Sequence, residues 1–307
     1  MKHKQTSESG DRVSPKKNGP RRWIFRGLFL ICLAVFVWSA WNFGSEFWRY
    51  YASKKEYANL AQNAKKPAVE SVAPTTVSVD PEPDETEADA ESESAPSQTS
   101  DTGNGTTDVP ISIPDTIDFN YLSSINSDVI AWITIPGTNV DYPVVQTTDN
   151  DYYLHYSFER KEYWIGCPFL DYRLNADFTS PNSCLYGHDV NDNAISTTMF
   201  AEIKKLLDSD FRSQHPYIYI YLPDKTLVYE VYSTYNASKV NEMFYLTYAN
   251  DAEYQVYLDQ SIANADYDTG IRPTVADRIL TLVTCNKDRN FRSVVQAVLR
   301  EELPAVH

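Results

Sequence analysis

Short apolar runs, separated by turn residues, make up most of the chain from about residue 117 to residue 303. Val, Ile and Tyr are frequent in these runs, and Gly, Pro, Asn and Asp interrupt them at short intervals. Such a pattern is typical of β-strands joined by tight turns. Eight short strands predict a closed or nearly closed β-barrel. The candidate strands are 129–135, 140–145, 167–171, 184–186, 217–222, 227–234, 279–284 and 293–299.

Two segments of the same region have helical spacing instead. Apolar residues repeat at helical intervals between Met199 and Leu207, after polar residues 196–198 that can cap the start of a helix. Asn250 and Glu253 form a capping pair ahead of a second apolar repeat. This second helix lies in a long excursion between two candidate strands. Long ordered excursions of compact domains are usually lids or binding walls.

The N-terminal residues have a different pattern. Residues 1–26 hold eight Lys or Arg and two acidic residues, and an apolar stretch follows at once. This arrangement predicts one membrane span at 27–48. The positive-inside rule keeps the basic arm in the cytoplasm and places the later residues outside the cell membrane. A cleaved signal peptide is the alternative, but Trp38 and Trp41 crowd the small residues that a cleavage site needs, which favours an uncleaved anchor.

Composition changes again after the apolar stretch. Residues 49–66 mix aromatic residues with Lys and Glu and predict a helix that leaves the membrane. Residues 67–113 are rich in Pro, Ser, Thr, Asp and Glu and contain no Lys or Arg. Such a tract cannot bury enough apolar area to offset its ordering entropy, so we expect a disordered acidic tether rather than a docking tail. The remainder, 114–307, is the extracytoplasmic globular domain.

Candidate chemistry gathers near the C-terminus. Cys285 ends one apolar run and Arg292 opens the next, so a thiol and a guanidinium are expected to face each other across a pair of strands. A fixed positive charge stabilises the nucleophilic thiolate form of cysteine. Three histidines in the domain are candidate bases: His155, which could be structural or line a groove, His215 at a turn, and His188, where a short apolar strand breaks at a glycine. Spacing alone only slightly favours His188.

Several motifs at once resemble one family. The segment TLVTC at 281–285 resembles the TLxTC motif of sortases, the membrane-anchored cysteine transpeptidases of Gram-positive bacteria, and YGH at 186–188 resembles their histidine motif. Further stretches resemble the class B branch, and together they cover the whole globular part: WITI to DYPVVQ at 132–146, DN and YYL at 149–154, FLDYR at 169–173 and YDTG at 267–270. Ordered motifs at family spacing are much more specific than one short pattern. The resemblance implies a mainly β fold, an eight-stranded sortase-type barrel with a few peripheral helices, behind one transmembrane helix and a disordered linker.

The resemblance also implies roles for individual residues. Cys285 would be the nucleophile, His188 the general acid/base, and Arg292 the cation that holds the substrate and its oxyanion. The excursion at 235–278 would read the substrate sequence. The implied substrate-groove residues are Asn150, Leu154, Tyr186 and Thr284, with the backbone N–H of Asn286 as an oxyanion donor.

The implied reaction is cleavage of a C-terminal sorting signal after Thr, through a thioester, and transfer of the surface protein to the amine of a peptidoglycan cross-bridge. Three alternatives remain open: a pilin-polymerising sortase with a lysine acceptor, a membrane-tethered binding protein that has lost catalysis, and a cysteine protease that releases its product to water. Two departures from the family pattern bear on them. Val283 stands where class B members often have serine, and the short Cys-to-Arg spacing leaves Arg289 as a competitor of Arg292.

The remaining cysteines, the ligand motifs and the net charge bear on other functional classes. Cys167 and Cys184 fall in neighbouring candidate strands on the oxidising side of the membrane, so they form a disulfide or are buried as small apolar residues. Cys32 lies in the predicted span. No Cys/His cluster has metal-ligand spacing and no phosphate-binding loop is present, so we expect no metal or cofactor. A net charge of −15 argues against nucleic acid as a partner.

Overall fold

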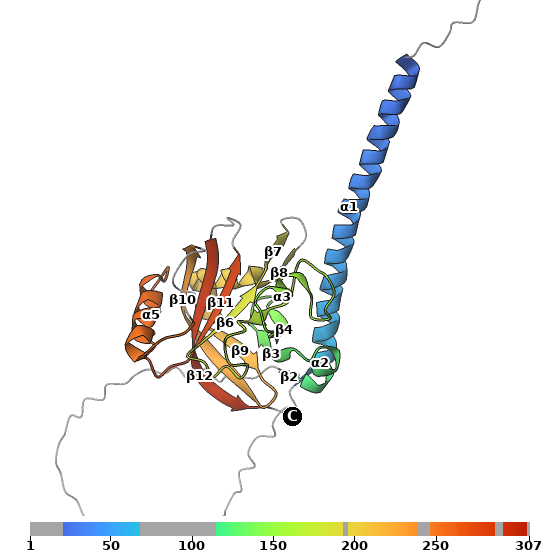
Figure 1. Cartoon of the computed structure of the whole chain (residues 1–307). Coiled ribbons are helices and arrows are strands. Elements are labelled where there is room, and N and C mark those ends of the chain that lie inside the picture. Colours follow the sequence, from blue (N-terminus) through green and yellow to red (C-terminus); the bar gives the residue numbers. More distant parts are fainter. Residues whose placement is uncertain (1–20, 68–114, 193–195, 239–245, 286–290, 306–307) are drawn as a thin grey trace, which may run out of the picture. The chain divides into compact units, whose positions relative to one another are not determined.

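The computed structural model describes residues 21–67, 115–192, 196–238, 246–285 and 291–305 (Figure 1). The chain divides into two compact units, Met1–Glu56 and Tyr57–His307. Every strand that the described residues form belongs to the second unit.

The first unit consists mainly of helix α1, Arg21–Ala64, whose last turns belong to the second unit. Among the described residues it is the one helix that is long and apolar enough to cross a membrane. Large apolar side chains along it, such as Trp38 and Trp41, are exposed. An exposed apolar surface of this length suits lipid better than water. The expected span at 27–48 and most of the expected helix at 49–66 are parts of this continuous element.

Eight strands of the second unit close into a barrel, in the order β10-β12-β11-β6-β5-β4-β3-β9. Because each strand is hydrogen bonded to both neighbours, the barrel leaves no open edge. Each strand lies where the sequence predicts it, so the predicted barrel is confirmed. The bounds are β3 Val129–Thr134, β4 Asp141–Val145, β5 Phe169–Leu170, β6 Asn182–Gly187, β9 Tyr217–Tyr221, β10 Lys225–Ser238, β11 Ile279–Cys285 and β12 Phe291–Pro304.

Strand β11 runs parallel to β6 on one side and antiparallel to β12 on the other. Alternate side chains of these strands fill the barrel, and Leu280, Leu282, Val295 and Ala297 are all fully buried. Burial of a large aliphatic side chain contributes about 1.5–3 kcal/mol. The apolar core therefore holds these three strands together up to the ends that carry the sequence motifs.

Smaller elements surround the barrel. They are β1 Lys65–Pro67, β2 Asp115–Ile117, α2 Phe119–Ile125, α3 Tyr152–His155, β7 Asp189–Asp192, β8 Ser196–Met199, the 3-10 helix η1 Phe200–Leu207, α4 Ser209–Gln214 and α5 Asp251–Ala263. The sequence predicts a few peripheral helices, and the structure has them.

The start of η1 differs from the prediction. The polar residues 196–198 do not cap a helix but belong to β8, which pairs with β7 in a separate two-stranded sheet. Met199 occupies the N-cap position, with φ +54° and no side-chain hydrogen bond to the helix. Because the ladder with β7 already uses the backbone of 196–198, the helix begins only at Phe200.

The start of α5 agrees with the prediction. The side chain of Asn250 accepts the backbone N–H of Glu253 at 3.0 Å, and α5 begins at Asp251. The carboxylate of Glu253 in turn accepts the N–H of Ala249 at 2.8 Å. Two backbone donors at the helix start are thus satisfied by side chains.

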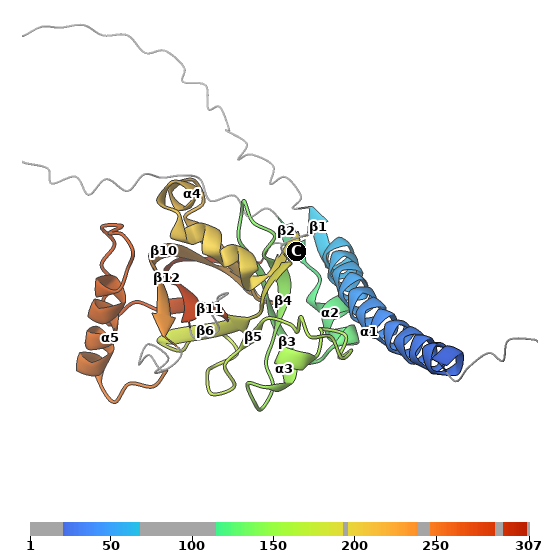
Figure 2. The ribbon, with the colours of Figure 1, turned by 90° about the horizontal axis from the view of Figure 1, so that it is seen from above.

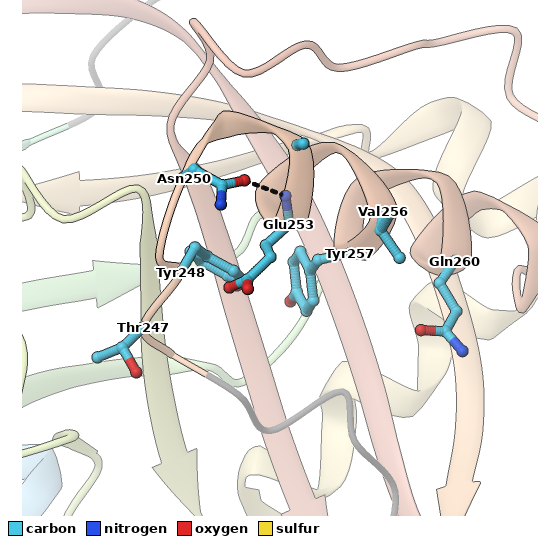
Figure 3. Close-up of a pocket in the computed structure, with 8 residues that line it drawn as sticks. Thr247, Tyr248, Asn250, Glu253, Val256, Tyr257 and Gln260 are labelled. Atoms are coloured by element: carbon cyan, nitrogen blue, oxygen red, sulfur yellow. Dashed lines mark hydrogen bonds between the residues drawn. The ribbon is translucent and has the colours of Figure 1, made fainter.

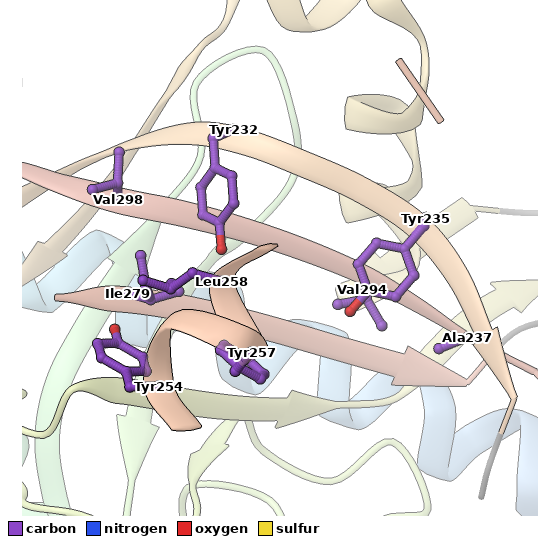
Figure 4. Packing of buried hydrophobic residues seen from close by; sticks show 9 residues of the cluster. All are labelled: Tyr232, Tyr235, Ala237, Tyr254, Tyr257, Leu258, Ile279, Val294 and Val298. Atoms are coloured by element: carbon purple, nitrogen blue, oxygen red, sulfur yellow. The ribbon is translucent and has the colours of Figure 1, made fainter. Parts of the chain in front are cut away.

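Helix α5 lies outside the barrel, beside the strands β10, β11 and β12 (Figure 2). Its buried face joins a cluster with those strands that is rich in tyrosine (Figure 4). The hydroxyl of Tyr257 accepts hydrogen bonds from Asn182 of β6 at 2.9 Å and from Gln296 of β12 at 2.6 Å. Packing and hydrogen bonds therefore fix this part of the 235–278 excursion to the barrel.

The second unit begins earlier than the domain start expected at 114. Strand β1 follows α1 directly and pairs antiparallel with β2, with Lys65 opposite Ile117 and Pro67 opposite Asp115. The N–H of Asp118 also donates to the carbonyl oxygen of Ala64 at 2.8 Å. The expected tether at 67–113 lies outside the described residues except for Pro67. The last turns of α1 are therefore part of the barrel unit.

Candidate active site

The register of three neighbouring strands brings the predicted catalytic positions side by side. Cys285 is the partner of Arg292 in the β11–β12 ladder. Thr284 is the partner of Gly187 in the β11–β6 ladder, so Cys285 and His188 are the residues that directly follow this last pair. Arg292, Cys285 and His188 thus lie in or directly after three adjacent strands at one end of the barrel, although positions 188 and 285 are 97 apart in sequence.

The imidazole of His188 is half-buried at this end of β6. Its Nε2 atom lies 2.9 Å from the carbonyl oxygen of Leu154. Because a carbonyl oxygen can only accept, Nε2 carries a hydrogen, and Nδ1 is the nitrogen that remains for proton transfer. Burial lowers the pKa of His188 below its ordinary value, and the neighbouring His155 and Arg292 lower it further, while the bond to Leu154 opposes this. Neutral His188 is therefore the favoured form at pH 7.

Arg292 lies at the start of β12 and is half-buried. Its Nη1 atom donates to the carbonyl oxygen of Phe291 at 3.3 Å. Its positive charge contributes to the lowered pKa of His188. The competing candidate Arg289 lies outside the described residues.

Two of the predicted groove residues share one carboxylate. The buried Asp171 accepts hydrogen bonds from Asn150 Nδ2 at 2.8 Å and from the hydroxyl of Tyr186 at 3.2 Å. It also forms a two-pronged pair with Arg173, with Nε and Nη2 both 2.8 Å from its oxygens. The N–H of Tyr172 donates to Asn150 Oδ1 at 3.1 Å. Both polar ends of the Asn150 amide are thus oriented by the protein.

Hydrogen bonds and a neighbouring positive charge explain why the carboxylate of Asp171 stays ionised although it is buried. Burial alone would raise the pKa of Asp171, but the hydrogen bonds from Arg173 and Asn150 outweigh that effect and hold the pKa below its ordinary value. The same burial raises the pKa of the Tyr186 phenol. Asp171 is therefore an anion that fixes two neighbouring polar side chains.

The remaining predicted groove residues lie close to the strand ends. Leu154 is in α3, and its carbonyl oxygen is the partner of His188. Thr284 is buried, and its hydroxyl donates to the carbonyl oxygen of Gly187 at 2.8 Å. Because this hydroxyl is used inside the barrel wall, it ties two strands together rather than facing a groove. Asn286 lies outside the described residues.

A pocket lies along one side of α5 and the residues before it (Figure 3). The hydroxyl of Tyr257 lies 3.3 Å from that of Thr281, four residues before Cys285 on β11. The 235–278 excursion therefore forms a pocket, and Tyr257 of its lining contacts the strand that ends at Cys285. The lining residues are Thr247, Tyr248, Asn250, Ala252, Glu253, Val256, Tyr257 and Gln260.

The structure also decides the roles left open for the other cysteines. Cys167 and Cys184 are both buried and do not form a disulfide. The Sγ of Cys167 lies 3.6 Å from the carbonyl oxygen of Pro143, and burial raises the pKa of Cys184 to about 12. The thiol of Cys184 is therefore protonated at neutral pH and unreactive. No group of potential metal ligands occurs within the described ranges.

The other candidate histidines are peripheral. His155 is exposed, and its Nε2 atom lies 3.6 Å from Oδ1 of Asp151, which is one helical turn earlier. His215 packs against Phe211, with ring centroids 4.6 Å apart, and against Gly137, where a Cβ atom would lie 2.7 Å from the imidazole. Sequence reasoning placed Asp171 only within a motif and assigned it no role. The sequence feature that could have indicated a role is a carboxylate at the end of an apolar run, followed two residues later by an arginine.

Comparison with known proteins identifies the family of the chain. The family model described as Sortase domain matches residues 133–300. Sortase B of Listeria monocytogenes is 26% identical over 284 residues, which cover 91% of this chain and 98% of that protein. Sortase B of Staphylococcus aureus is 34% identical over 167 residues, 54% of this chain and 67% of that protein. The solved Staphylococcus aureus sortase B-substrate complex has a TM-score of 0.56 at 32% identity, over 60% of this chain and 84% of that chain. The chain therefore belongs to the sortase family, in its class B branch.

Proposed function

We propose that this sortase is a cysteine transpeptidase in which Cys285 is the nucleophile, His188 the general acid/base and Arg292 the cation at the reacting centre. One observation carries the proposal: the strand register that aligns Arg292, Cys285 and the end of β6 at one end of the barrel. Among the described residues, His188 is the histidine that lies directly after β6, next to these aligned strand ends.

The first half-reaction forms a thioester. The sulfur of Cys285 attacks the threonyl carbonyl carbon of the sorting signal, and the thiol proton passes to Nδ1 of His188. The tetrahedral intermediate then breaks its C–N bond. The leaving amine takes the proton from the imidazolium of His188, which becomes neutral again. The low pKa of this imidazole makes its protonated form a good acid for that step.

The second half-reaction transfers the acyl group. The acceptor amine attacks the thioester carbon and gives a proton to neutral His188, and the C–S bond then breaks. The thiolate recovers its proton from His188. Developing negative charge on the carbonyl oxygen is stabilised in both halves by Arg292, with the backbone N–H of Asn286 as the second proposed donor.

We assign substrate recognition to two groups of residues. Asn150 and Tyr186, held by Asp171, form one group, and the residues that line the pocket beside α5 form the other. The related Staphylococcus aureus sortase B is known as a complex with substrate, which supports a substrate-binding role for this protein as well. The proposed substrates are surface proteins with a C-terminal sorting signal, cleaved after Thr, and the proposed acceptor is a peptidoglycan cross-bridge amine.

The proposed location follows from α1 and its charge. The protein is a single-pass membrane protein, with the basic arm in the cytoplasm and the barrel unit outside the cell. Its substrates and acceptor are on that side of the membrane.

The decisive experiment uses the full chain with a labelled sorting peptide. Cys285→Ala is expected to abolish cleavage, while Cys32→Ala, which alters an exposed cysteine of α1, is expected to keep wild-type rates. Accumulation of an acyl-enzyme on the wild-type protein, detected by mass spectrometry, identifies the thioester. Cleavage that persists in Cys285→Ala contradicts the proposal.

The acceptor is identified in the same assay. A cross-bridge peptide amine, a lysine-bearing pilin peptide and water alone are offered in parallel. We expect ligation to the cross-bridge amine and only slow hydrolysis without it. Ligation only to the lysine peptide would identify a pilin polymerase, and equal hydrolysis with every acceptor a protease. A wild-type protein that binds the peptide without cleaving it would be a binding protein.

A further inference from the structure

Tyr57 connects the last turns of α1 to a loop beside the barrel. Its side chain is 5% exposed, and its hydroxyl donates to the carbonyl oxygen of Gly166 at 2.6 Å. The hydroxyl oxygen of Tyr57 in turn accepts the backbone N–H of Phe158 at 3.2 Å. Its ring packs edge-on against Tyr142, with centroids 5.4 Å apart. One buried phenol therefore holds the loop at two backbone positions.

Gly166 is also in direct contact with the catalytic histidine candidate. A Cβ atom at this position would lie 3.3 Å from Cδ2 of His188 and 2.3 Å from the carbonyl oxygen of Tyr153. The φ angle of Gly166 is +62°, in the region that favours glycine. The φ angle and the carbonyl oxygen of Tyr153 require glycine here, and the main chain of Gly166 lies next to the imidazole, so a shift of Gly166 would alter the packing of the ring.

The imidazole is held from a second direction by the neighbouring segment. Leu154 accepts the hydrogen bond from Nε2 of His188 at 2.9 Å. The carbonyl oxygen of Tyr153 accepts the N–H of Cys167 at 3.0 Å, which joins the two segments that contact the ring. His188 thus lies in a backbone cradle formed by residues 153–154 and 166–167.

We propose that Tyr57 is a positioning residue for His188: by fixing Gly166, it sets the orientation of the imidazole and so the place of Nδ1 in the reaction. The helix that contains the membrane-span candidate thereby supplies a support of the active site. This inference rests on the proposed role of His188 as acid/base. Tyr57 itself touches neither the reacting atoms nor the imidazole ring in this scheme.

The test is Tyr57→Phe in the full chain, with Tyr51→Phe as the matched control. Tyr51 is on the same helix and its side chain is 61% exposed. We expect Tyr57→Phe to lower kcat roughly tenfold with little change in KM for the peptide, because orientation of a catalytic group affects the reaction step more than binding. We expect Tyr51→Phe to match the wild type in both.

A second measurement does not depend on activity. NMR titration of the His188 imidazole should show its midpoint moving upward in Tyr57→Phe, toward the ordinary histidine pKa, because a looser cradle admits water. The groups that act on this imidazole by charge, His155 and Arg292, are unchanged in the variant. Amide hydrogen exchange should also show faster exchange at Phe158, whose N–H loses its acceptor.

The outcomes separate the two proposals. If Tyr57→Phe matches the wild type in kcat, in the His188 titration and in exchange at Phe158, the positioning role is wrong and the proposed reaction stands. If the wild-type protein itself forms no thioester, the proposed reaction fails, and the titration and exchange still test the cradle. If the variant is too unstable to assay, protection of the Phe158 amide in the wild type decides, because an unprotected amide contradicts the hydrogen bond to Tyr57.

Discussion

The hydroxyl of Thr284 donates a hydrogen bond to the carbonyl oxygen of Gly187 at 2.8 Å. These two residues are register partners in parallel strands, and each directly precedes a proposed catalytic residue, Cys285 and His188. The bond is buried in the barrel wall. It therefore ties together the two strand ends whose spacing the reaction depends on.

Replacing this hydroxyl should loosen that spacing. In Thr284→Val the carbonyl oxygen of Gly187 loses its partner, which we expect to cost about 1–3 kcal/mol of unfolding free energy. Peptide cleavage should fall by about tenfold or more, since small misplacements of catalytic groups slow reactions strongly. Thr284→Ser keeps the hydroxyl and should restore most of both. Chemical denaturation and steady-state kinetics measure the two effects, and equal activity in the valine and serine variants would contradict the role of the bond.

Removal of the proposed cation should mainly slow the reaction step. Arg292→Gln is expected to lower kcat by roughly 10²–10³, the usual loss when one oxyanion donor is removed. Arg300→Gln is the matched control, because Arg300 is on the same strand but pairs with Glu230 at 2.6 Å. Single-turnover kinetics with the labelled peptide measure both variants. A large loss in Arg289→Gln together with little change in Arg292→Gln would move the assignment to Arg289.

The titration of His188 offers a test of the electrostatics. Burial and the charge of Arg292 lower its pKa, so NMR should find the midpoint below 6.5, and Arg292→Gln should move it upward. The unfolded chain then binds more protons than the folded one between the folded and unfolded pKa values. This contribution to stability is complete above 6.5 and is lost as pH falls toward the folded pKa. A midpoint at or above 6.5 in the wild type would contradict this environment.

The network around Asp171 should affect substrate binding more than chemistry. Asp171→Asn keeps the shape of the side chain but removes the charge that Arg173, Asn150 and Tyr186 share. We expect KM for the sorting peptide to rise several-fold while kcat changes less, and the unfolding free energy at pH 7 to fall by about 1–3 kcal/mol. Peptide titration and denaturation measure these changes.

Two comparisons make the Asp171 test specific. Asp259→Asn changes an exposed carboxylate of α5 and should leave KM and the unfolding free energy unchanged.

Because the pKa of Asp171 is lowered in the folded protein, its contribution to stability is present above its ordinary pKa and is lost as pH falls through the folded value. The wild type and Asp171→Asn should therefore converge in stability at strongly acidic pH. A constant difference at every pH would contradict a role for the charge.

Local chemistry explains which elements could be predicted. The eight barrel strands are short apolar runs bounded by turn residues, and their pattern does not depend on distant contacts. The cap of α5 was also predictable, because Asn250 and Glu253 act within one helical turn. The start of η1 was not, because the pairing of 196–199 with 189–192 overrides the local capping signal. The absence of a disulfide between Cys167 and Cys184 was not predictable either, since neighbouring strands do not specify whether two thiols face each other.

The barrel strands, the apolar helix and the motif residues could be predicted from the sequence, because strand and helix patterns depend on residues close to one another. The folded chain was needed to show how Asp171 orders Asn150 and Tyr186, and how Tyr57 reaches Gly166 across 109 residues of sequence. It also showed that the last turns of α1 belong to the barrel unit. These relationships depend on which buried hydrogen-bonding groups come into contact after the barrel closes, and no local sequence pattern specifies those contacts.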